Sequence, residues 1–305
     1  MRPSYLGDLE GLTEFEYIEP KTVKEACSLL SQYQEKAKVI AGGTKLLASM
    51  KRKEVSAQYL INLKSIPNLE YINYSVGEGL KIGALTTLFE ISRSSIVDDK
   101  AKILVEAVQQ RNPGMNKTRW AYYMATIGGH LSNPGNSAEI VPALILMGAK
   151  AVIEGPKGWK TIPLEEFFVK TGGNVLQNDE VLIEIRTPEQ PAESGIVYMK
   201  SHGTTYAPPF SVAVLLKLDA KHVNIEKIKI VAGGITPNAS EARDAEGIMG
   251  GNPIDNDLIE QTAQTAAQEI SGGSDSETTE RVKELIEEAL RQAVDRAIGE
   301  FALGY

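Results

Sequence analysis

Apolar positions in the first half of the chain switch repeatedly between helical and strand-like spacing. Residues 22–34 carry apolar side chains at intervals of three and four, and Thr22 and Glu25 have the spacing of a capping box, so we expect a helix there. Short apolar runs predict strands in AKVIAG, QYLINL, LEYINYS, LKIGAL and KAVIEG. The spacing predicts helices in KLLASMK, TLFEISRS, KILVEAVQQ and EIVPALILMGA. The first half is therefore expected to mix helices and strands.

A stretch with two prolines and a glycine, residues 187–195 (TPEQPAESG), has the composition of a linker. Three strand-like runs follow it directly, GIVYMKSH, FSVAVLLKLDA and IEKIKIVAGGI, and strands in succession predict an antiparallel sheet. From residue 240 onward the apolar spacing is helical, interrupted by the loop GGSDS. We therefore predict an α+β chain of two domains, residues 12–190 and residues 191–305, with strands before helices in the second.

Composition and charge narrow the function classes. The chain has 305 residues, 42% of them hydrophobic and 24% charged, which suits a globular protein of two domains. Its net charge of -8 argues against nucleic acid as a ligand, because phosphate binding needs concentrated lysine and arginine. No apolar run reaches the roughly 18 residues of a membrane span, and the acidic N-terminal stretch lacks the apolar core of a secretory signal. We therefore predict a cytoplasmic protein without a membrane span.

Cysteine and histidine usage argues against a metal site. Cys27 is the single cysteine, and it falls on the apolar side of the helix expected at residues 22–34, where a packing role is expected. One cysteine excludes an internal disulfide and a cysteine-ligated zinc or iron–sulfur site within the chain. His130, His202 and His222 are scattered without metal-type spacing. We expect no metal on this chain.

A first glycine-rich turn lies at residues 39–51 (VIAGGTKLLASMK), where a predicted strand ends at Gly42, Gly43 and Thr44 and leads into a predicted helix. Such a turn leaves backbone N–H groups without partners, and glycine lets a ligand approach the main chain, so it could seat a pyrophosphate. It matches neither the Rossmann fingerprint nor the P-loop. Taken alone, a plain tight turn with a helix cap is the better explanation.

A second glycine-rich turn lies at residues 126–133 (TIGGHLSN), with Gly128 and Gly129 flanked by hydroxyl and amide side chains. Glu139 begins the next predicted helix, where an acid either stabilises the helix end or accepts hydrogen bonds from ligand hydroxyls. Two glycine turns that each precede a helix could hold a long, anionic, hydroxyl-bearing ligand from two sides.

Six segments carry a resemblance, and they occur in order: VIAGGTKLLASMK, LKIGALTTLFEI, ATIGGHLSNPGNSAEIVPALILMGAKAVI, DEVLIEIRTP, YMKS and IVAGGITPNASEAR. From about residue 15 to the last helix, the chain resembles the FAD-binding medium subunits of the molybdenum hydroxylases, the xanthine dehydrogenase and carbon monoxide dehydrogenase family. The resemblance implies an FAD-binding domain of the PCMH type with two α/β subdomains. It also implies a C-terminal α+β domain like that of the carbon monoxide dehydrogenase flavoproteins, with a small antiparallel sheet and helices.

The same resemblance implies a flavoprotein oxidoreductase subunit that is active only within a complex. A large molybdopterin subunit would oxidise the substrate, and a small subunit with two [2Fe–2S] clusters would relay the electrons. FAD on this chain would pass them to NAD or another acceptor.

The resemblance further implies the cofactor-binding residues. The two glycine turns would contact FAD directly, Glu139 would contact its hydroxyls, and Leu182 would pack against the flavin. Lys200 would lie near the isoalloxazine ring, where a cation can stabilise the reduced form; spacing alone leaves it open as a solvated strand lysine. No residue of the chain would be catalytic in itself. The implied set is Val39, Ile40, Ala41, Gly42, Gly43, Thr44, Lys45, Leu46, Thr126, Ile127, Gly128, Gly129, His130, Glu139, Leu182 and Lys200.

Several residues depart from the family pattern. His130 stands where asparagine is usual, Glu139 where aspartate is usual, Tyr122 within a motif that usually reads Arg-Asn-x-Ala-Thr, and Thr204 where an arginine is frequent. These departures put the acceptor, the redox tuning and the FAD affinity in question. The aromatic segment 111–124 (RNPGMNKTRWAYYM) is either part of a partner interface or packed inside the first domain.

Two other functions remain open on the sequence. A self-contained flavin oxidoreductase of the same cofactor fold, such as the peptidoglycan-precursor reductases, would need its own substrate domain with a proton donor, and no such constellation is visible. A structural subunit that has lost FAD would agree with the departures. An absorption spectrum of the purified chain separates this last reading from the others.

Overall fold

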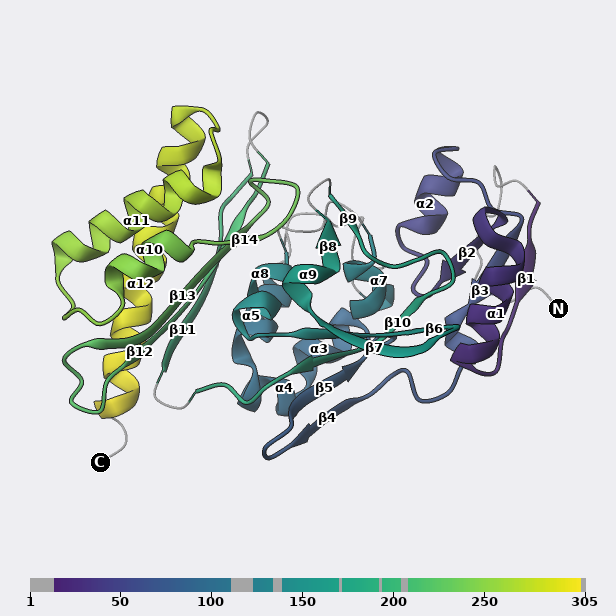
Figure 1. The fold of residues 1–305 in the computed structure, drawn as a ribbon, viewed down its shortest axis with the longest axis horizontal. Coiled ribbons are helices and arrows are strands. Elements are labelled where there is room, and N and C mark those ends of the chain that lie inside the picture. Colours follow the sequence, from purple (N-terminus) through teal and green to yellow (C-terminus); the bar gives the residue numbers. More distant parts are fainter. Residues whose placement is uncertain are drawn as a thin grey trace.

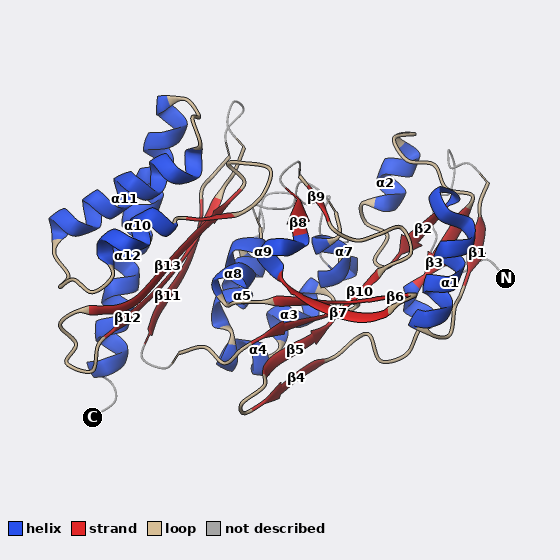
Figure 2. Cartoon of the chain, viewed as in Figure 1, coloured by secondary structure: helices blue, strands red, loops and turns tan. Residues whose placement is uncertain are grey.

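The computed structural model describes residues 14–110, 123–133, 139–169, 172–191, 194–203 and 208–302. The molecule is elongated, and three units follow one another along its long axis, from the N-terminal sheet to the C-terminal helices (Figure 1). Helices and strands are interspersed along the chain in the first two units, whereas the third has its strands before its helices (Figure 2).

The N-terminal unit is a parallel sheet of β1 (Glu16–Ile18), β3 (Tyr59–Asn62) and β2 (Ala37–Ile40), in that order. Helices α1 (Val23–Tyr33) and α2 (Leu46–Lys51) belong to this unit, with short 3-10 turns at Gln34–Lys36 and Leu63–Ser65. The predicted capping box is half present. Thr22 Oγ1 accepts from the Glu25 N–H at 3.1 Å, but the Glu25 carboxylate accepts from the Lys21 N–H instead of returning to Thr22. Cys27 is buried, as its place on the apolar side of the helix predicted.

The middle unit is built on an antiparallel sheet of β4 (Ile72–Ser75), β5 (Gly79–Gly83), β10 (Val181–Thr187), β6 (Lys150–Gly155) and β7 (Gly158–Pro163), in that order. One face of this sheet shares a core with helices α3 (Leu88–Arg93), α4 (Ser95–Lys100), α5 (Lys102–Gln109), α7 (Ile127–Leu131), α8 (Val141–Leu146) and α9 (Leu164–Phe167). The opposite face packs partly against α1 of the N-terminal unit. A small two-stranded sheet, β8 (Phe168–Val169) and β9 (Gly173–Asn174), follows α9.

The C-terminal unit is an antiparallel sheet of β11 (Ser194–Lys200), β12 (Ser211–Leu218), β13 (Ile225–Gly233) and β14 (Ser240–Glu241). Helices α10 (Arg243–Met249), α11 (Asn256–Ser271) and α12 (Ser276–Ala302) cover its outer face, and α5 and α8 of the middle unit contact its inner face (Figure 1). This arrangement confirms the predicted α+β class, with strands first and helices afterwards.

Polar contacts join the C-terminal unit to the middle unit. The Lys229 ammonium on β13 donates to the Ile145 carbonyl at 3.2 Å and to the Glu165 carboxylate at 3.1 Å. The Arg296 guanidinium on α12 lies 3.4 Å from the Glu106 carboxylate on α5. These contacts fix the C-terminal sheet against the unit that carries the second glycine turn. Across the residues that the structure covers, no helix is both long and apolar enough to cross a bilayer.

Candidate functional site

A pocket of about 340 Å³ lies between the N-terminal and middle units, and both glycine turns open into it. Its walls come from the end of β2, the first turn of α2, the chain before and within α7, and the start of β10. The lining residues are Lys38, Val39, Ala41, Gly42, Gly43, Thr44, Lys45, Leu46, Ser49, Val55, Leu63, Ala84, Leu85, Ala125, Thr126, Gly128, Gly129, His130, Ser132, Asn133, Leu176, Glu180, Val181 and Leu182.

The first glycine turn leaves β2 at Ile40, whose side chain is buried, and reaches α2 at Leu46. Its shape depends on a close contact with the chain that precedes the second turn. A Cβ at position 42 would lie 1.9 Å from the Met124 carbonyl oxygen, so Gly42 is required by protein packing. The first turn therefore contacts the chain that leads into the second turn.

The second glycine turn is held from behind by the chain at residues 84–88. The Leu88 N–H donates to the Ala125 carbonyl, the Ile127 N–H to the Thr86 carbonyl and the Gly128 N–H to the Ala84 carbonyl, each at 2.9 Å. A Cβ at position 128 would lie 2.8 Å from the Ala84 carbonyl oxygen. The sequence suggested ligand approach as the reason for Gly128, but the structure shows that protein packing already requires it.

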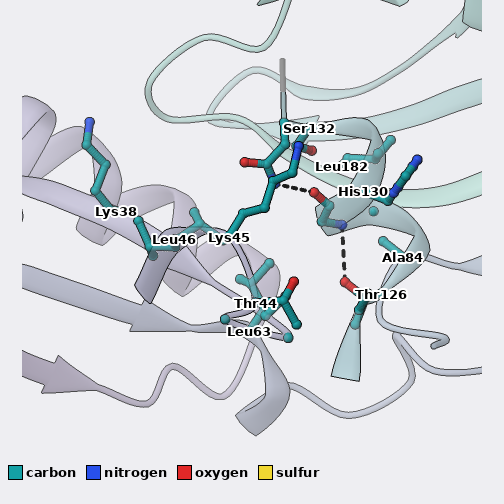
Figure 3. A pocket seen from close by; sticks show the side chains of 18 of the residues that line it. Lys38, Thr44, Lys45, Leu46, Leu63, Ala84, Thr126, His130, Ser132 and Leu182 are labelled. Atoms are coloured by element: carbon teal, nitrogen blue, oxygen red, sulfur yellow. Dashed lines mark hydrogen bonds between the residues drawn. The ribbon is translucent and has the colours of Figure 1, made fainter. Parts of the chain in front are cut away.

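The side chains around the pocket combine cationic and hydroxyl donors with apolar surface. Lys45 and Thr44 come from the first turn, and Thr126 and Ser132 flank the second; Leu182 lies beside them (Figure 3). Thr126 Oγ1 accepts from the Gly129 N–H at 3.1 Å and so caps α7. Ammonium and hydroxyl groups suit a pyrophosphate and a polyol, and apolar side chains suit rings. The lining therefore matches the chemistry of a long, anionic, hydroxyl-bearing ligand.

Most of the residues implied by the resemblance line this pocket, and four do not. Ile40 and Ile127 are buried in the apolar cores on either side of it. Glu139 lies outside the lining, behind His130. Its carboxylate is 3.6 Å from Nδ1 of His130, whose side chain is only 2% exposed. Lys200 ends β11 on the C-terminal sheet, outside the lining.

Tyr198 connects the C-terminal sheet to Glu139. Its hydroxyl donates to the Glu139 carbonyl at 2.9 Å, and its ring is buried in the core of the middle unit. Tyr198 and Lys200 lie on the same face of β11, because strand residues two apart point the same way. The positions of Glu139 and Lys200 thus both depend on the contact between the middle and C-terminal units.

Several lining residues were missed by sequence reasoning. Ordinary strand or turn positions hold Lys38, Leu63 and Ala84. The loop before β10 contributes Leu176 and Glu180. They reach the pocket through the tertiary packing of separate elements, and no local motif marks them. Ser132 and Asn133, the hydroxyl and amide residues at the end of the second glycine turn, do lie in the lining.

Among the described residues, no group of three or more histidine, cysteine, aspartate or glutamate side chains is arranged to hold a metal ion. Burial, followed by the nearby carboxylates of Glu154, Asp179 and Glu180, raises the pKa of the Cys27 thiol to about 12. Cys27 is therefore a protonated packing residue at neutral pH.

Some of the departures from the family pattern lie outside the described residues. These are Tyr122, Thr204 and most of the aromatic segment 111–124. From that segment, Tyr123 is 39% exposed, and its ring lies 4.6 Å from the ring of Phe89 on α3.

Comparisons with known proteins cover almost the whole chain. Residues 13–190 match the model of the FAD binding domain in molybdopterin dehydrogenase, and residues 207–297 match that of the CO dehydrogenase flavoprotein C-terminal domain. The carbon monoxide dehydrogenase medium chain of Hydrogenophaga pseudoflava is 31% identical, and the alignment covers 92% of this chain and 96% of that relative. The xanthine dehydrogenase FAD-binding subunit of Escherichia coli O157:H7 is 26% identical over 94% of this chain and 90% of its own length.

A solved structure shares the fold. A chain of carbon monoxide dehydrogenase from Hydrogenophaga pseudoflava, in a form that lacks the Mo-pyranopterin moiety of the molybdenum cofactor, matches with a TM-score of 0.83 at 30% identity. The match covers 93% of this chain and 99% of that chain.

Proposed function

The chain belongs to the FAD-binding medium subunits of the molybdenum hydroxylase family, and we propose that it is the electron-transfer subunit of such a complex. Bound FAD would supply the redox chemistry, taking electrons from the iron–sulfur clusters of a small partner subunit and delivering them to NAD or another acceptor. A large molybdopterin subunit would oxidise the organic substrate. The single observation that carries the proposal is that both glycine turns open into one pocket with matching donors.

The residues present fit FAD. Lys45, Thr44 and the backbone of the first turn offer donors to a pyrophosphate, and Thr126, Ser132 and Asn133 offer donors and acceptors to hydroxyl groups. Leu46, Leu63 and Leu182 supply apolar surface for rings. The pocket volume of about 340 Å³ lies at the lower end of what ligand sites of this kind have.

The chain's own residues would bind and orient the cofactor. We propose the FAD-contacting set that the resemblance implies, with Ile40 and Ile127 acting through their backbone because their side chains point into the cores. Glu139 would accept from FAD hydroxyls, and His130 beside it would hold its carboxylate in place. Lys200 would lie near the isoalloxazine ring, as part of a contact between the two domains.

We propose a domain boundary between residues 190 and 191, in the connection from β10 to β11. We also propose that the surface around the aromatic segment 111–124 contacts the partner that carries the iron–sulfur clusters. Tyr123 is 39% exposed, which supports a surface position for the C-terminal end of this segment.

The test uses the full chain, purified without partners and stripped of flavin. Titration with FAD should produce a yellow protein with the absorption of a bound flavin, and a chemical reductant should bleach it. Organic substrates should give no turnover until the large and small subunits are added. Failure to bind FAD would favour the structural subunit, and substrate turnover in partner-free protein would favour the self-contained oxidoreductase.

A further inference from the structure

The second glycine turn depends on the support segment, which we define as residues 84–88. Three backbone hydrogen bonds of 2.9 Å join the support segment to residues 125–128. The Ala84 N–H in turn donates to the Ile183 carbonyl at 2.9 Å, next to Leu182 in the pocket wall. A shift of the support segment would therefore move two walls of the pocket together.

Thr86 anchors the support segment to the chain before β4. Its hydroxyl accepts from the Tyr71 N–H at 3.1 Å and donates to the Tyr71 carbonyl at 3.0 Å. Both hydrogen-bonding functions of the hydroxyl are thus used, and the residue is only 2% exposed. Loss of the hydroxyl is costly, because the Tyr71 N–H would be left without its partner, although the Tyr71 carbonyl keeps the Gly83 N–H at 2.9 Å.

Tyr71 is itself fixed, so it can act as an anchor. Its phenol donates to the buried carboxylate of Glu184 on β10, and the Arg186 guanidinium donates to the same carboxylate. The chain of contacts runs from β10 through Tyr71 and Thr86 to the second glycine turn. Thr86 does not line the pocket, so any effect on a ligand must pass through the support segment.

We propose that Thr86 is a positioning residue, whose hydroxyl holds the second glycine turn in the geometry that binds FAD. The inference rests on the proposed function, because it assigns that turn to FAD. Without the hydroxyl, the support segment loses its side-chain link to Tyr71. It keeps its backbone hydrogen bonds, such as that from the Leu85 N–H to the Leu69 carbonyl at 2.8 Å, so the turn is held less firmly in the position that faces the first turn.

The experiment compares Thr86→Val, which keeps the shape and removes the hydroxyl, with Thr86→Ser, which keeps the hydroxyl. Thr187→Val is the matched control. Thr187 lies on β10, is also 2% exposed, and its hydroxyl has no hydrogen-bond partner among the described residues. Each full-length variant is stripped of flavin, and its FAD dissociation constant, its unfolding midpoint without FAD and the visible circular dichroism of its bound flavin are measured.

Thr86→Val should bind FAD about ten-fold more weakly, equivalent to about 1.4 kcal/mol, with an altered flavin dichroism. Thr86→Ser should restore wild-type affinity to within about two-fold, and Thr187→Val should leave FAD affinity and dichroism unchanged. The proposal is wrong if Thr86→Val binds FAD like wild type, if serine does not rescue, or if Thr187→Val weakens FAD equally. A wild-type chain that binds no FAD would instead refute the proposed function.

Hydrogen exchange on the wild-type chain tests the same coupling if Thr86→Val does not fold. FAD should slow exchange in peptides that cover the support segment and residue 71, in addition to those that cover residues 125–130. Protection confined to residues 125–130 would overturn the coupling, because the support segment would then be independent of the ligand.

Discussion

At the scale of single residues, the glycines of the site have two different roles. Gly42 and Gly128 are fixed by contacts within the protein, whereas Gly43 has φ of +70°, a conformation that side chains rarely adopt. The sequence could identify these glycines but not separate the roles, since Met124 and Ala84, which they contact, are distant in the chain. Loss of FAD from a Gly128 variant would therefore say little about ligand contact.

Gly42→Ala should destabilise the flavin-free chain, because its Cβ would overlap the Met124 carbonyl oxygen at 1.9 Å. We expect a loss of about 1–3 kcal/mol in the free energy of unfolding, typical of overpacking, measured by urea denaturation without FAD.

Gly247→Ala is the matched control for this substitution. Gly247 lies in α10, and its added Cβ would meet no atom within 4 Å. It should be neutral or stabilising, since alanine favours helix. Equal unfolding midpoints for Gly42→Ala and wild type would contradict the close contact.

Glu139→Gln should weaken FAD binding without unfolding the domain. The amide keeps the shape beside His130 but removes the charge that would accept from FAD hydroxyls. Hydrogen bonds to charged groups contribute roughly 1.5–3 kcal/mol, so the dissociation constant should rise at least about ten-fold in an FAD titration.

Glu166→Gln on α9, at an exposed position, provides the control and should leave FAD affinity unchanged. Unchanged affinity for Glu139→Gln, together with a small loss of thermal stability, would show that Glu139 serves as a helix-end residue.

At the scale of elements, apolar periodicity predicted those elements that bury one face. The amphipathic α1 and α12 and the strands β11, β12 and β13 occur where the pattern placed them. The pattern did not reveal β7, because this edge strand is exposed along almost its whole length. The second glycine turn was visible as a glycine cluster, but its central part, Ile127–Leu131, folds as helix α7 and does not precede a helix. Its hydrogen bonds to the support segment were not predictable, because pairing between distant segments leaves no local signal.

Helix α10 carries a half-buried acid whose ionisation should make stability depend on pH. Glu246 accepts from the Ile230 N–H at 2.7 Å. Burial, then the neighbouring carboxylates of Glu241 and Glu269, raises its pKa to about 7, although Lys229 and the Ile230 N–H oppose the rise. Because the folded state holds this proton more tightly than the unfolded state, the contribution to stability is present below pH 4.5 and is lost as pH rises to about 7.

Glu246→Gln should therefore be more stable than wild type at pH 8, by up to about 3 kcal/mol, and the difference should largely vanish at pH 5. The glutamine can still accept from the Ile230 N–H. Urea midpoints of both proteins at the two pH values provide the measurement. A difference that is the same at both pH values would contradict the raised pKa of Glu246.

At the scale of the whole molecule, the C-terminal unit contacts the middle unit by apolar packing and by polar contacts. Tyr198 connects the C-terminal sheet to Glu139, and Lys229 connects it to the end of α8 and to α9. The position of Lys200 relative to the pocket depends on this contact. Sequence patterns indicated a linker at residues 187–195 but could not show how the C-terminal unit docks on the middle unit, since docking is decided by side chains from both.

Lys229→Met should loosen the docking of the C-terminal unit. The Lys229 side chain is 16% exposed, and its ammonium also lies 3.5 Å from the Glu241 carboxylate. Its removal leaves the Glu165 and Glu241 carboxylates with the Arg243 guanidinium alone, at 3.4 and 3.5 Å. We expect a loss of about 1–3 kcal/mol and faster proteolysis in the connection between β10 and β11.

Lys227→Met is the control for Lys229→Met. It changes an exposed lysine two residues earlier on the same face of β13, and it should have little effect. Equal proteolysis of the two variants would show that apolar packing alone holds the units together.

The N-terminal and middle units meet at the contact between Gly42 and the Met124 carbonyl, beside the pocket. The stability of the chain should therefore depend on the supply of cofactor in the cell. A ligand bound between the two turns would contact both the N-terminal and the middle unit. Its binding free energy would therefore add to the free energy of unfolding of the chain. At a free FAD concentration of 100 times the dissociation constant, this linkage would contribute about 2.7 kcal/mol. Scarcity of FAD would then reduce the amount of folded subunit available for assembly. The abundance of the whole complex would therefore depend on the flavin supply of the cell.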